Sequence, residues 1–461
     1  MRAGRGGGGG AFSSSGEGGS GGPGGATGTG GAGGEGGATG TGGEGGGLTG
    51  NAGLGAPAWA HVYPNDGNAQ GLCIASDASG NFYVTGEFEG TVDFGVGPMT
   101  SAGGSDIFLL KLDPSGATLW SKRFGSPHGE TAFDVTIDAS GDLLLVGSYG
   151  GDAAVPSVDF GGGPLPAPGT FSSAGFVVKL DPDGSHLWSR GALVSEFTEL
   201  RRQSAETIAV DALGNAYVTL HSAGDTEGVV SVARLDAEGA LVWTREIPTA
   251  GNLNRHGDLA LDSAGNVLAV SESKYSPTGY CPCVLQFAVT KFAPTGDVIW
   301  SWLIGPESPR DTYPETGVGA VAVAVDAADE IFLSGWSFDE FDFGDGGLPG
   351  GPLLVKLDAE GELIFSWPAN FNSAIAADAA GAIFLSGNAS TSINGLAGHD
   401  ADRTESWTIF FWGQSHTRDM CVSPLGTIAL TGTAYDEEVG FGSDAIPVGH
   451  PSEAFVAAFT H

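Results

Sequence analysis

Short hydrophobic runs alternate with turn residues along most of the chain. Residues 131–147 are typical: an apolar run ends at Asp138, Ala-Ser-Gly follows, and a Leu-Leu-Leu-Val run begins at Leu143. Runs of this length, bounded by Asp and Gly, predict two strands joined by a hairpin turn. The apolar residues fall on both parities, as in residues 108–110, which predicts sheets covered on both faces.

This strand–turn–strand unit recurs along the chain. Its turn begins at Asp77, Asp138, Asp211, Asp262, Asp326 and Asp378, and at Ser423 in a seventh copy that lacks the Asp. A second unit follows each copy, with an aromatic residue in its last strand: Trp120, Trp188, Trp243, Trp300 and Phe365, and only residues 408–412 in the degraded sixth copy. Four strands per repeat, at a spacing of roughly 58 residues, are typical of propeller blades. The sequence therefore predicts an all-β fold, a seven-bladed β-propeller with four-stranded blades over residues 57–461.

The two ends of the repeat region complement one another. Residues 453–459 match the third strand of a blade, and no fourth strand follows them. Residues 57–63, with Trp59, match the fourth strand at residues 119–124. We therefore expect residues 58–63 to complete the last blade beside residues 453–459, closing the ring with an N-terminal strand and leaving no sheet edge exposed.

The Asp and Gly of the recurring turns have a structural explanation. Asp accepts hydrogen bonds from the backbone of its own turn, and Gly adopts the positive φ that the hairpin needs. The alternative is calcium ligation, which residues 181–184 superficially suggest, but the further ligands of an EF-hand are absent from the sequence. Lys111, Lys179, Lys291 and Lys356 recur at strand ends, where we expect each to pair with a nearby Asp.

Composition divides the chain in two. Of the first 50 residues, 27 are glycine, so residues 1–56 are predicted to be a disordered Gly-rich linker. The net charge of −36 argues against nucleic acid and anionic membrane surfaces as partners, and no apolar run is long enough for membrane insertion. No signal sequence is visible, and we expect the true start to lie upstream, with the protein extracellular or on the cell surface.

The repeats resemble the bacterial SBBP-type β-propeller family, which occurs in secreted and cell-surface proteins and in lipoproteins of myxobacteria-like organisms. The resemblance rests on residues 104–116 with Leu119-Trp120, and on the Asp-Phe-Gly sequence at residues 93–95, 159–161 and 342–344. It covers most of residues 57–461 and implies an extracytoplasmic location without shared catalytic residues. Because Asp-Phe-Gly recurs as a blade feature, it is not the magnesium motif of a kinase.

Candidate ligand-binding residues fall in the connections from the fourth strand of one blade to the first of the next. Loops there converge on the channel of a propeller, and they concentrate positive charge in an acidic protein. The candidates are His128, Arg201, Arg202, Arg255, His256, Arg310, Asn372, His416 and Arg418. The alternative is that these are ordinary solvated loops with local ion pairs.

Two functions remain open at this stage, beside a purely structural or adhesive spacer. The first is a non-enzymatic, monomeric scaffold that binds a protein or glycan partner through its loop face, without a cofactor or metal. The second is an extracytoplasmic lyase or hydrolase that uses a metal at His128, His256 and His416. No Gly-x-Ser-x-Gly elbow, His-Glu-x-x-His or P-loop motif is present in residues 57–461, which favours the first. Cys73 and Cys421 are predicted to be buried thiols near the axis, whereas Cys281 and Cys283 could be thiols, a metal site or a local disulfide.

Overall fold

The structure is a computed structural model. It describes residues 56–151, 155–168, 173–193, 202–223, 228–248, 253–275, 284–305, 316–378, 380–390, 393–400, 405–442, 445–450 and 452–460. Contacts divide the chain into residues 1–49 and residues 50–461, and all described strands belong to the second unit. Within the ranges above, the only regular elements are β-strands, as the sequence predicts.

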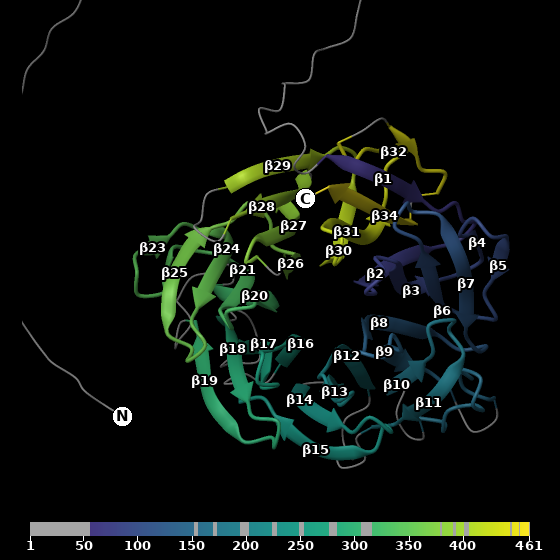
Figure 1. Cartoon of the computed structure of the whole chain (residues 1–461), viewed down its shortest axis with the longest axis horizontal. Coiled ribbons are helices and arrows are strands. Elements are labelled where there is room, and N and C mark those ends of the chain that lie inside the picture. The colour runs from purple at the N-terminus through teal and green to yellow at the C-terminus, as the bar shows by residue number, and fades with distance from the viewer. Residues whose placement is uncertain are drawn as a thin grey trace, which may run out of the picture. The chain divides into compact units, whose positions relative to one another are not determined.

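Most strands belong to four-stranded antiparallel sheets of consecutive strands (Figure 1). Three of them are β2 (Ala69–Ser76), β3 (Phe82–Phe88), β6 (Asp106–Leu112) and β7 (Thr118–Phe124); β8 (Glu130–Ile137), β9 (Leu143–Tyr149), β10 (Ala174–Leu180) and β11 (His186–Gly191); and β12 (Arg202–Val210), β13 (Ala216–Ala223), β14 (Gly228–Leu235) and β15 (Leu241–Glu246). This arrangement is typical of propeller blades.

The following strands repeat the pattern. They are β16 (Leu253–Leu261), β17 (Val267–Tyr275), β18 (Val284–Phe292) and β19 (Val298–Ile304); β20 (Thr316–Val325), β21 (Ile331–Ser337), β24 (Gly351–Leu357) and β25 (Leu363–Pro368); and β26 (Ala374–Ala377), β27 (Ile383–Ser390), β28 (Ile393–His399) and β29 (Glu405–Phe411). A short parallel pairing of β18 with β20 joins the first two groups into one eight-stranded sheet.

The last sheet combines strands from both ends of the described chain. It contains β30 (Ser415–Val422), β31 (Thr427–Ala434), β34 (Glu453–Thr460) and β1 (Pro57–Val62). β1 pairs antiparallel with β34, with Val62 opposite Phe455 and Pro57 opposite Phe459. The N-terminal strand therefore lies where the sequence places it.

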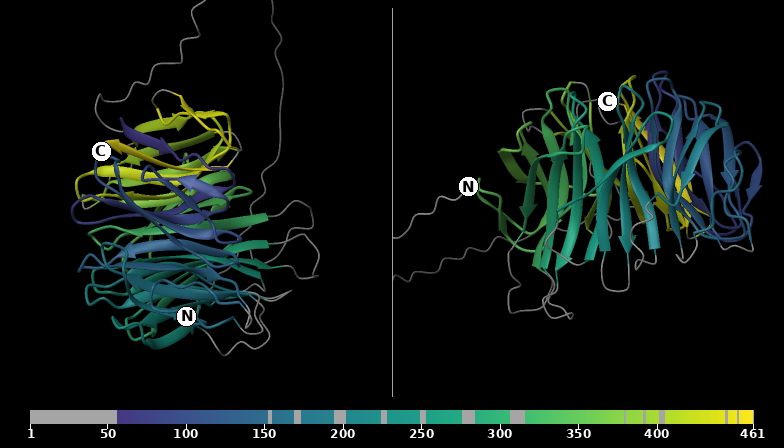
Figure 2. Two further views of the ribbon diagram at one scale, coloured as in Figure 1. Left: turned by 90° about the vertical axis from the view of Figure 1, so that its right-hand side faces the viewer. Right: turned by 90° about the horizontal axis from the view of Figure 1, so that it is seen from below.

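We call β2, β8, β12, β16, β20, β26 and β30 the inner strands, and β7, β11, β15, β19, β25, β29 and β1 the outer strands. In Figure 1 the inner strands surround the centre and the outer strands lie at the rim. Each inner strand contacts the inner strand of the next sheet, and β30 contacts β2. In the side views of Figure 2 the strands run between two opposite faces.

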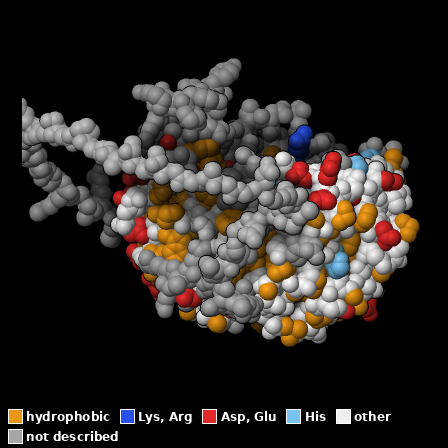
Figure 3. Space-filling model, turned by 90° about the horizontal axis from the view of Figure 1, so that it is seen from above, with side chains coloured by type: hydrophobic (Ala, Val, Ile, Leu, Met, Phe, Trp, Pro, Cys, Tyr) orange, Lys and Arg blue, Asp and Glu red, His pale blue; other side chains and the backbone are white. Residues whose placement is uncertain are grey.

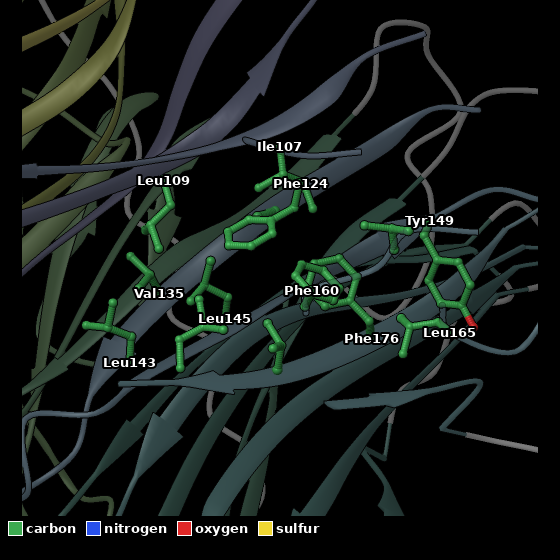
Figure 4. Close-up of a cluster of buried hydrophobic side chains, with 14 of the residues drawn as sticks. Ile107, Leu109, Phe124, Val135, Leu143, Leu145, Tyr149, Phe160, Leu165 and Phe176 are labelled. Atoms are coloured by element: carbon green, nitrogen blue, oxygen red, sulfur yellow. The ribbon is translucent and has the colours of Figure 1, made fainter. Parts of the chain in front are cut away.

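The hydrophobic core lies between neighbouring sheets. In Figure 4, Ile107 and Leu109 of β6 face Val135 of β8 and Leu145 of β9, and all four are buried. Phe160, from one of the Asp-Phe-Gly sequences, packs against Phe176 with ring centroids 4.9 Å apart. Because each sheet is covered on its two faces by two neighbouring sheets, its strands need apolar residues at both odd and even positions, as the sequence pattern indicates.

The recurring turns are built as predicted from their sequence. In the turn after β2, Asp77 Oδ1 accepts hydrogen bonds from the backbone N–H groups of Ser79 and Asn81, both at 2.9 Å. The turn after β6 repeats this arrangement with Asp113. The hairpin of β4 (Thr91–Asp93) and β5 (Pro98–Thr100) repeats it with Asp93, and the hairpin of β22 (Phe341–Asp342) and β23 (Gly347–Leu348) repeats it with Asp342. The corresponding hairpin of β32 (Glu438–Val439) and β33 (Ile446–Pro447) has Gly440 in place of the Asp.

The strand-end lysines are also engaged within the fold. Lys179 lies 2.7 Å from Asp138, and Lys291 lies 2.9 Å from Asp262, which confirms the expected pairing. Lys356 pairs instead with Glu330, and Lys111 donates to the carbonyl of Pro182 across the Tyr83 ring.

The outer strands are fastened to the next sheet by a repeated contact. The indole N–H of Trp188 in β11 donates to the carbonyl of Ala237, 3.1 Å away in the turn before β15. The same ring covers Gly239 of that turn, where a Cβ atom would lie 2.8 Å from Trp188 Cε3. We call each such pair a Trp–Gly staple; the four pairs are Trp59 with Gly116, Trp188 with Gly239, Trp243 with Gly296, and Trp300 with Gly361.

Candidate functional site

A cavity of about 290 Å³ lies on the axis, at mid-length of the inner strands. All seven inner strands, or residues directly beside them, contribute to its wall. The lining residues are Leu72, Cys73, Phe133, Asp134, Glu206, Thr207, Gly257, Asp258, Ala322, Ser373, Ala374, Ile375, Arg418 and Asp419. We call this space the axial cavity.

One equivalent position from each inner strand forms a single layer around the axial cavity. The layer consists of Cys73, Asp134, Thr207, Asp258, Ala322, Ala374 and Asp419, and we call it the channel layer. Each member stands four residues before the Asp or Ser that begins the following turn. In several inner strands an irregularity in the pairing register adjoins this position, as between Ala132 and Asp134. Such bulges bend an edge strand and re-aim its side chains.

The aspartates of the channel layer bind the neighbouring inner strand. Asp134 Oδ2 accepts a hydrogen bond from the N–H of Ile208 in β12, at 2.7 Å. Asp419 accepts in the same way from Ile74 in β2, at 2.9 Å, and Asp258 accepts from Val323 in β20, at 2.8 Å. These bonds join β8 to β12, β30 to β2 and β16 to β20.

Cys73 makes the corresponding contact with β8, through sulfur. Its Sγ atom lies 3.4 Å from the N–H of Val135, and the thiol donates to Asp134 Oδ1 at 2.8 Å. Burial, and after it the neighbouring carboxylates of Asp134 and Asp419, raise the pKa of this thiol well above its usual range. Cys73 is therefore a hydrogen-bond donor and not a reactive thiolate. Cys73 and Cys421 are both free thiols, as predicted.

The three channel-layer carboxyl groups have raised pKa values. Burial is the largest cause in each, and it raises the pKa of Asp134 and Asp419 to about 6 and that of Asp258 to about 7. The hydrogen bond of the Cys73 thiol lowers the pKa of Asp134 and Asp419, and backbone N–H donors lower the pKa of all three, whereas their mutual repulsion raises it. The side chains face the cavity and are only partly buried by area, but they lie away from bulk water, so each charge loses much of its hydration.

The rest of the cavity wall mixes polar and apolar groups. Arg418 is exposed and lies beside Asp419. Glu206 accepts a hydrogen bond from Ser204 at 3.0 Å and lies 3.3 Å from His221 Nδ1. Phe133 adds an aromatic side chain. The wall can therefore accept and donate hydrogen bonds and also contact an apolar surface of a ligand.

The predicted ligand-binding residues are only partly brought to this cavity. Of the nine, Arg418 lines it. His416 is exposed two residues earlier in β30, and burial, followed by the Arg418 charge, lowers the pKa of its imidazole. Arg202 is exposed at the start of β12. His128 and Asn372 are half-buried, just before β8 and β26 respectively.

The remaining predicted residues fall partly outside the described structure. Arg201 and Arg310 lie outside the described residues, as do Cys281 and Cys283. Arg255 and His256 lie in β16, and the structure describes only their backbone.

The expectation that these residues lie in loops was wrong for several of them. Arg202, Arg255, His256, His416 and Arg418 all belong to inner strands. The reason is that the inner strands extend to pair with the full length of their neighbours: Arg255 lies opposite Glu272 and His416 opposite Thr433. This extension satisfies backbone N–H and C=O groups that a loop would leave to water.

The channel layer itself was missed by reasoning from the sequence. A signal was present, because Asp134, Asp258 and Asp419 each stand four residues before a turn and directly before an apolar residue of their strand. A charged residue inside a buried strand indicates a specific partner.

Metal ligands and membrane spans can be assessed only for the described part of the chain. There, no group of three or more His, Cys, Asp or Glu side chains is arranged to hold a metal ion. This does not test the predicted site at His128, His256 and His416, because the His256 side chain is not described. No helix in the described ranges is long and apolar enough to cross a membrane.

Comparisons with known proteins concern the fold. No family model matches the chain. A curated relative, an uncharacterized WD repeat-containing protein of Acanthamoeba polyphaga mimivirus, is 23% identical over 193 residues, which cover 36% of this chain and 14% of that protein. The chain thus matches only a small part of this relative, and the similarity is weak.

Solved structures of β-propeller-like proteins are similar over most of both chains. The polysaccharide lyase Uly1 is 10% identical, with a TM-score of 0.46 over 85% of this chain and 90% of that chain. A PL25 ulvan lyase is 12% identical, with a TM-score of 0.47 over 85% and 96%. Regucalcin, a calcium-binding protein from Agrobacterium tumefaciens, is 10% identical, with a TM-score of 0.37 over 88% and 95%. Likeness at this level does not bear on activity.

Proposed function

We propose that residues 57–461 form a seven-bladed β-propeller of the SBBP type, with β1 as the outer strand of the last blade. The seven copies of the repeat and the contacts of each inner strand with the next support this architecture. The pairing of β1 with β34 supports closure of the ring. The indole N–H of Trp59 also donates to the carbonyl of Pro114, 3.1 Å away in the first sheet.

The proposed function is non-enzymatic binding of a glycan or protein partner at the axial cavity and the loop face around it. The observation that carries this proposal is the axial cavity itself, to which every inner strand contributes. Ligand sites are usually concave, mostly preformed, and contain a few convergent polar groups. Carboxyl groups, Thr207 and Arg418 supply acceptors and donors there, which suits the hydroxyl-rich surface of a sugar.

Exposed basic residues on the inner strands extend the proposed site. Arg202, His416 and Arg418 are exposed on inner strands, in a chain with a net charge of −36. On the part of the rim shown in Figure 3, acidic side chains lie among hydrophobic ones. The arginines would therefore mark where an anionic group of the partner binds, because opposite charges steer such a group to them. We propose a monomer that acts outside the cell or on its surface.

A binding screen tests this proposal directly. The intact protein is applied to arrays of acidic and neutral glycans and of surface proteins, and the Kd of any bound partner is measured. We expect Arg418→Ala to weaken binding about tenfold or more, because a hydrogen bond to a charged group contributes about 1.5–3 kcal/mol. Lys122→Ala on outer strand β7 is the control and should leave Kd unchanged.

Two results would reject the proposal. One is unchanged binding in Arg202→Ala, His416→Ala and Arg418→Ala, which would place the partner elsewhere. The other is a stoichiometric transition metal in the purified protein, together with cleavage of a polysaccharide, which would favour the lyase or hydrolase instead.

A further inference from the structure

The channel layer places three carboxyl groups around one cavity and uses each of them as a junction between inner strands. Asp134, Asp258 and Asp419 stand on β8, β16 and β30, and each accepts a backbone N–H of the next inner strand. We call these residues the aspartate trio. Asp258 also accepts the N–H of Leu259 at 2.8 Å, so its two oxygens both have donors.

The Cys73 thiol compensates the trio in part, since it donates to Asp134 Oδ1 at 2.8 Å, but no cation does so among the described residues. Facing it are the Cys73 thiol from β2, the Cys421 thiol from β30, the Glu206 carboxyl from β12 and the exposed Arg418 from β30. Asp134 and Asp419 repel one another, and Asp258 interacts unfavourably with both. No ion pair joins an Asp of the trio to a cation in the described part of the chain.

We propose that the aspartate trio is a proton-responsive junction, which takes up protons in mildly acidic solution and then stabilises the ring of inner strands. This inference is independent of the proposed ligand. A neutral carboxyl group keeps its carbonyl oxygen as an acceptor for the N–H of the next inner strand, and the proton goes to the other oxygen, so the junction between strands persists after protonation. What protonation removes is the repulsion between three charges around one cavity and the cost of their poor hydration.

The direction of the effect follows from linkage. The pKa of each trio member is raised in the folded protein above the ordinary value of 3.8, to between about 6 and about 7. A raised carboxyl pKa contributes stability that is fully present below the unfolded-state pKa. That contribution is lost as the pH rises through about 6 and 7, so the trio makes the fold less stable at pH 8 than at pH 5.

Thermal unfolding of a variant that cannot take up the protons tests the proposal. In the triple variant Asp134→Asn, Asp258→Asn, Asp419→Asn, each side chain is neutral at every pH and keeps an acceptor oxygen. The quantity measured is the Tm of the variant minus the Tm of the wild type. We expect this difference to be about 3–5 °C larger at pH 8 than at pH 5. Comparing the two proteins at the same pH cancels the titration of all other groups.

Asp342→Asn is the matched control. Asp342 Oδ1 also accepts two backbone N–H groups, from Gly344 and Gly346, but it is exposed and these bonds lower its pKa. Because this carboxyl group titrates below pH 5, the control should shift Tm by the same amount at pH 5 and pH 8.

A direct titration covers the case in which the triple variant does not fold. Carboxyl carbon NMR of the wild type, assigned with the single Asn variants, should give three midpoints above pH 5. Midpoints at ordinary Asp values would overturn the proposal. A Tm difference between wild type and triple variant that does not change with pH would overturn it equally.

Discussion

The inner and outer edges of the sheets both bind the neighbouring sheet, but through different kinds of side chain. At the rim, the same device recurs, because Trp59, Trp188, Trp243 and Trp300 each cover a glycine of the next sheet. At the axis, equivalent positions carry Cys, Asp, Thr and Ala in different repeats. Repetition at the rim suits a contact that only assembles the ring. Variation at the axis produces an asymmetric cavity, which a ring of identical repeats could not provide.

The two edges also differ in how they depend on pH. Every Trp–Gly staple has an apolar ring contact, and those of Trp59, Trp188 and Trp243 add an uncharged hydrogen bond, such as that from Trp243 to the carbonyl of Pro294 at 3.0 Å. A staple has no group that titrates near neutral pH. The axis is joined through Asp134, Asp258 and Asp419, whose charges are poorly hydrated. The rim therefore provides constant stability, while the contribution of the axis changes with the medium.

Removing β1 should have the largest effect on this comparison. Deletion of residues 57–62 takes away both the partner strand of β34 and the staple of Trp59 on the first sheet. The exposed edge of β34 can then pair with other chains. We expect a loss of more than about 10 °C in Tm, or insolubility, measured by thermal unfolding and by soluble yield.

A length-matched deletion of residues 41–46, in the glycine-rich segment, is the control for the loss of β1. It should leave Tm and soluble yield unchanged. If removal of β1 has no more effect than this control, the N-terminal strand does not close the ring.

A methyl group inserted under a staple should have the next largest effect. Gly239 has a φ of 78° and lies under Trp188, whereas Gly426 has a φ of 79° and no atom near the position of a Cβ. Both alanine variants bear the strain of a positive φ, about 1–2 kcal/mol. Only Gly239→Ala must also displace the indole, so we expect it to be less stable than Gly426→Ala by a further 1–3 kcal/mol, roughly.

Denaturant unfolding of the two glycine variants measures this difference. Equal destabilisation would mean that the ring of Trp188 moves aside freely and that the staple adds little to the contact between sheets.

The turns and the strand positions were predictable from the sequence because the interactions that form them are local and repeated. The Asp–Gly turns follow from the hydrogen bonds of one Asp with its own turn, and the strand positions follow from short apolar runs between those turns. Even the pairing of residues 57–62 with Glu453–Thr460 follows from a missing strand in the last repeat. The staples were not predicted, since the partner of Trp188 lies in the next sheet, 49 residues away.

The axis was predicted poorly because its geometry depends on where strands begin and on which side chains face inward. Arg255 and His416 read as loop residues, since polar residues near turns usually are, yet both extend an inner strand. Asp134 and Asp419 are 285 positions apart in the sequence, and only the tertiary fold brings them to one cavity. The residues around Asp134 and Asp419 in the sequence therefore do not indicate that these two side chains line the same cavity.

The smallest expected effect isolates a single hydrogen bond at the rim. Trp188→Phe keeps an aromatic ring over Gly239 but loses the donor to the carbonyl of Ala237. Trp300→Phe makes the same change over Gly361, but the indole N–H of Trp300 is buried and makes no hydrogen bond to the described residues. Trp188→Phe loses the bond, whereas Trp300→Phe removes an N–H that is buried without a partner among the described residues. Because a neutral hydrogen bond contributes about 1 kcal/mol and the loss of an unpaired buried donor is favourable, we expect Trp188→Phe to be the less stable variant by about 1 kcal/mol or more in denaturant unfolding. Equal stabilities would show that the staples act through ring packing alone, and the contrast with the hydrogen-bonded axis would then be sharper.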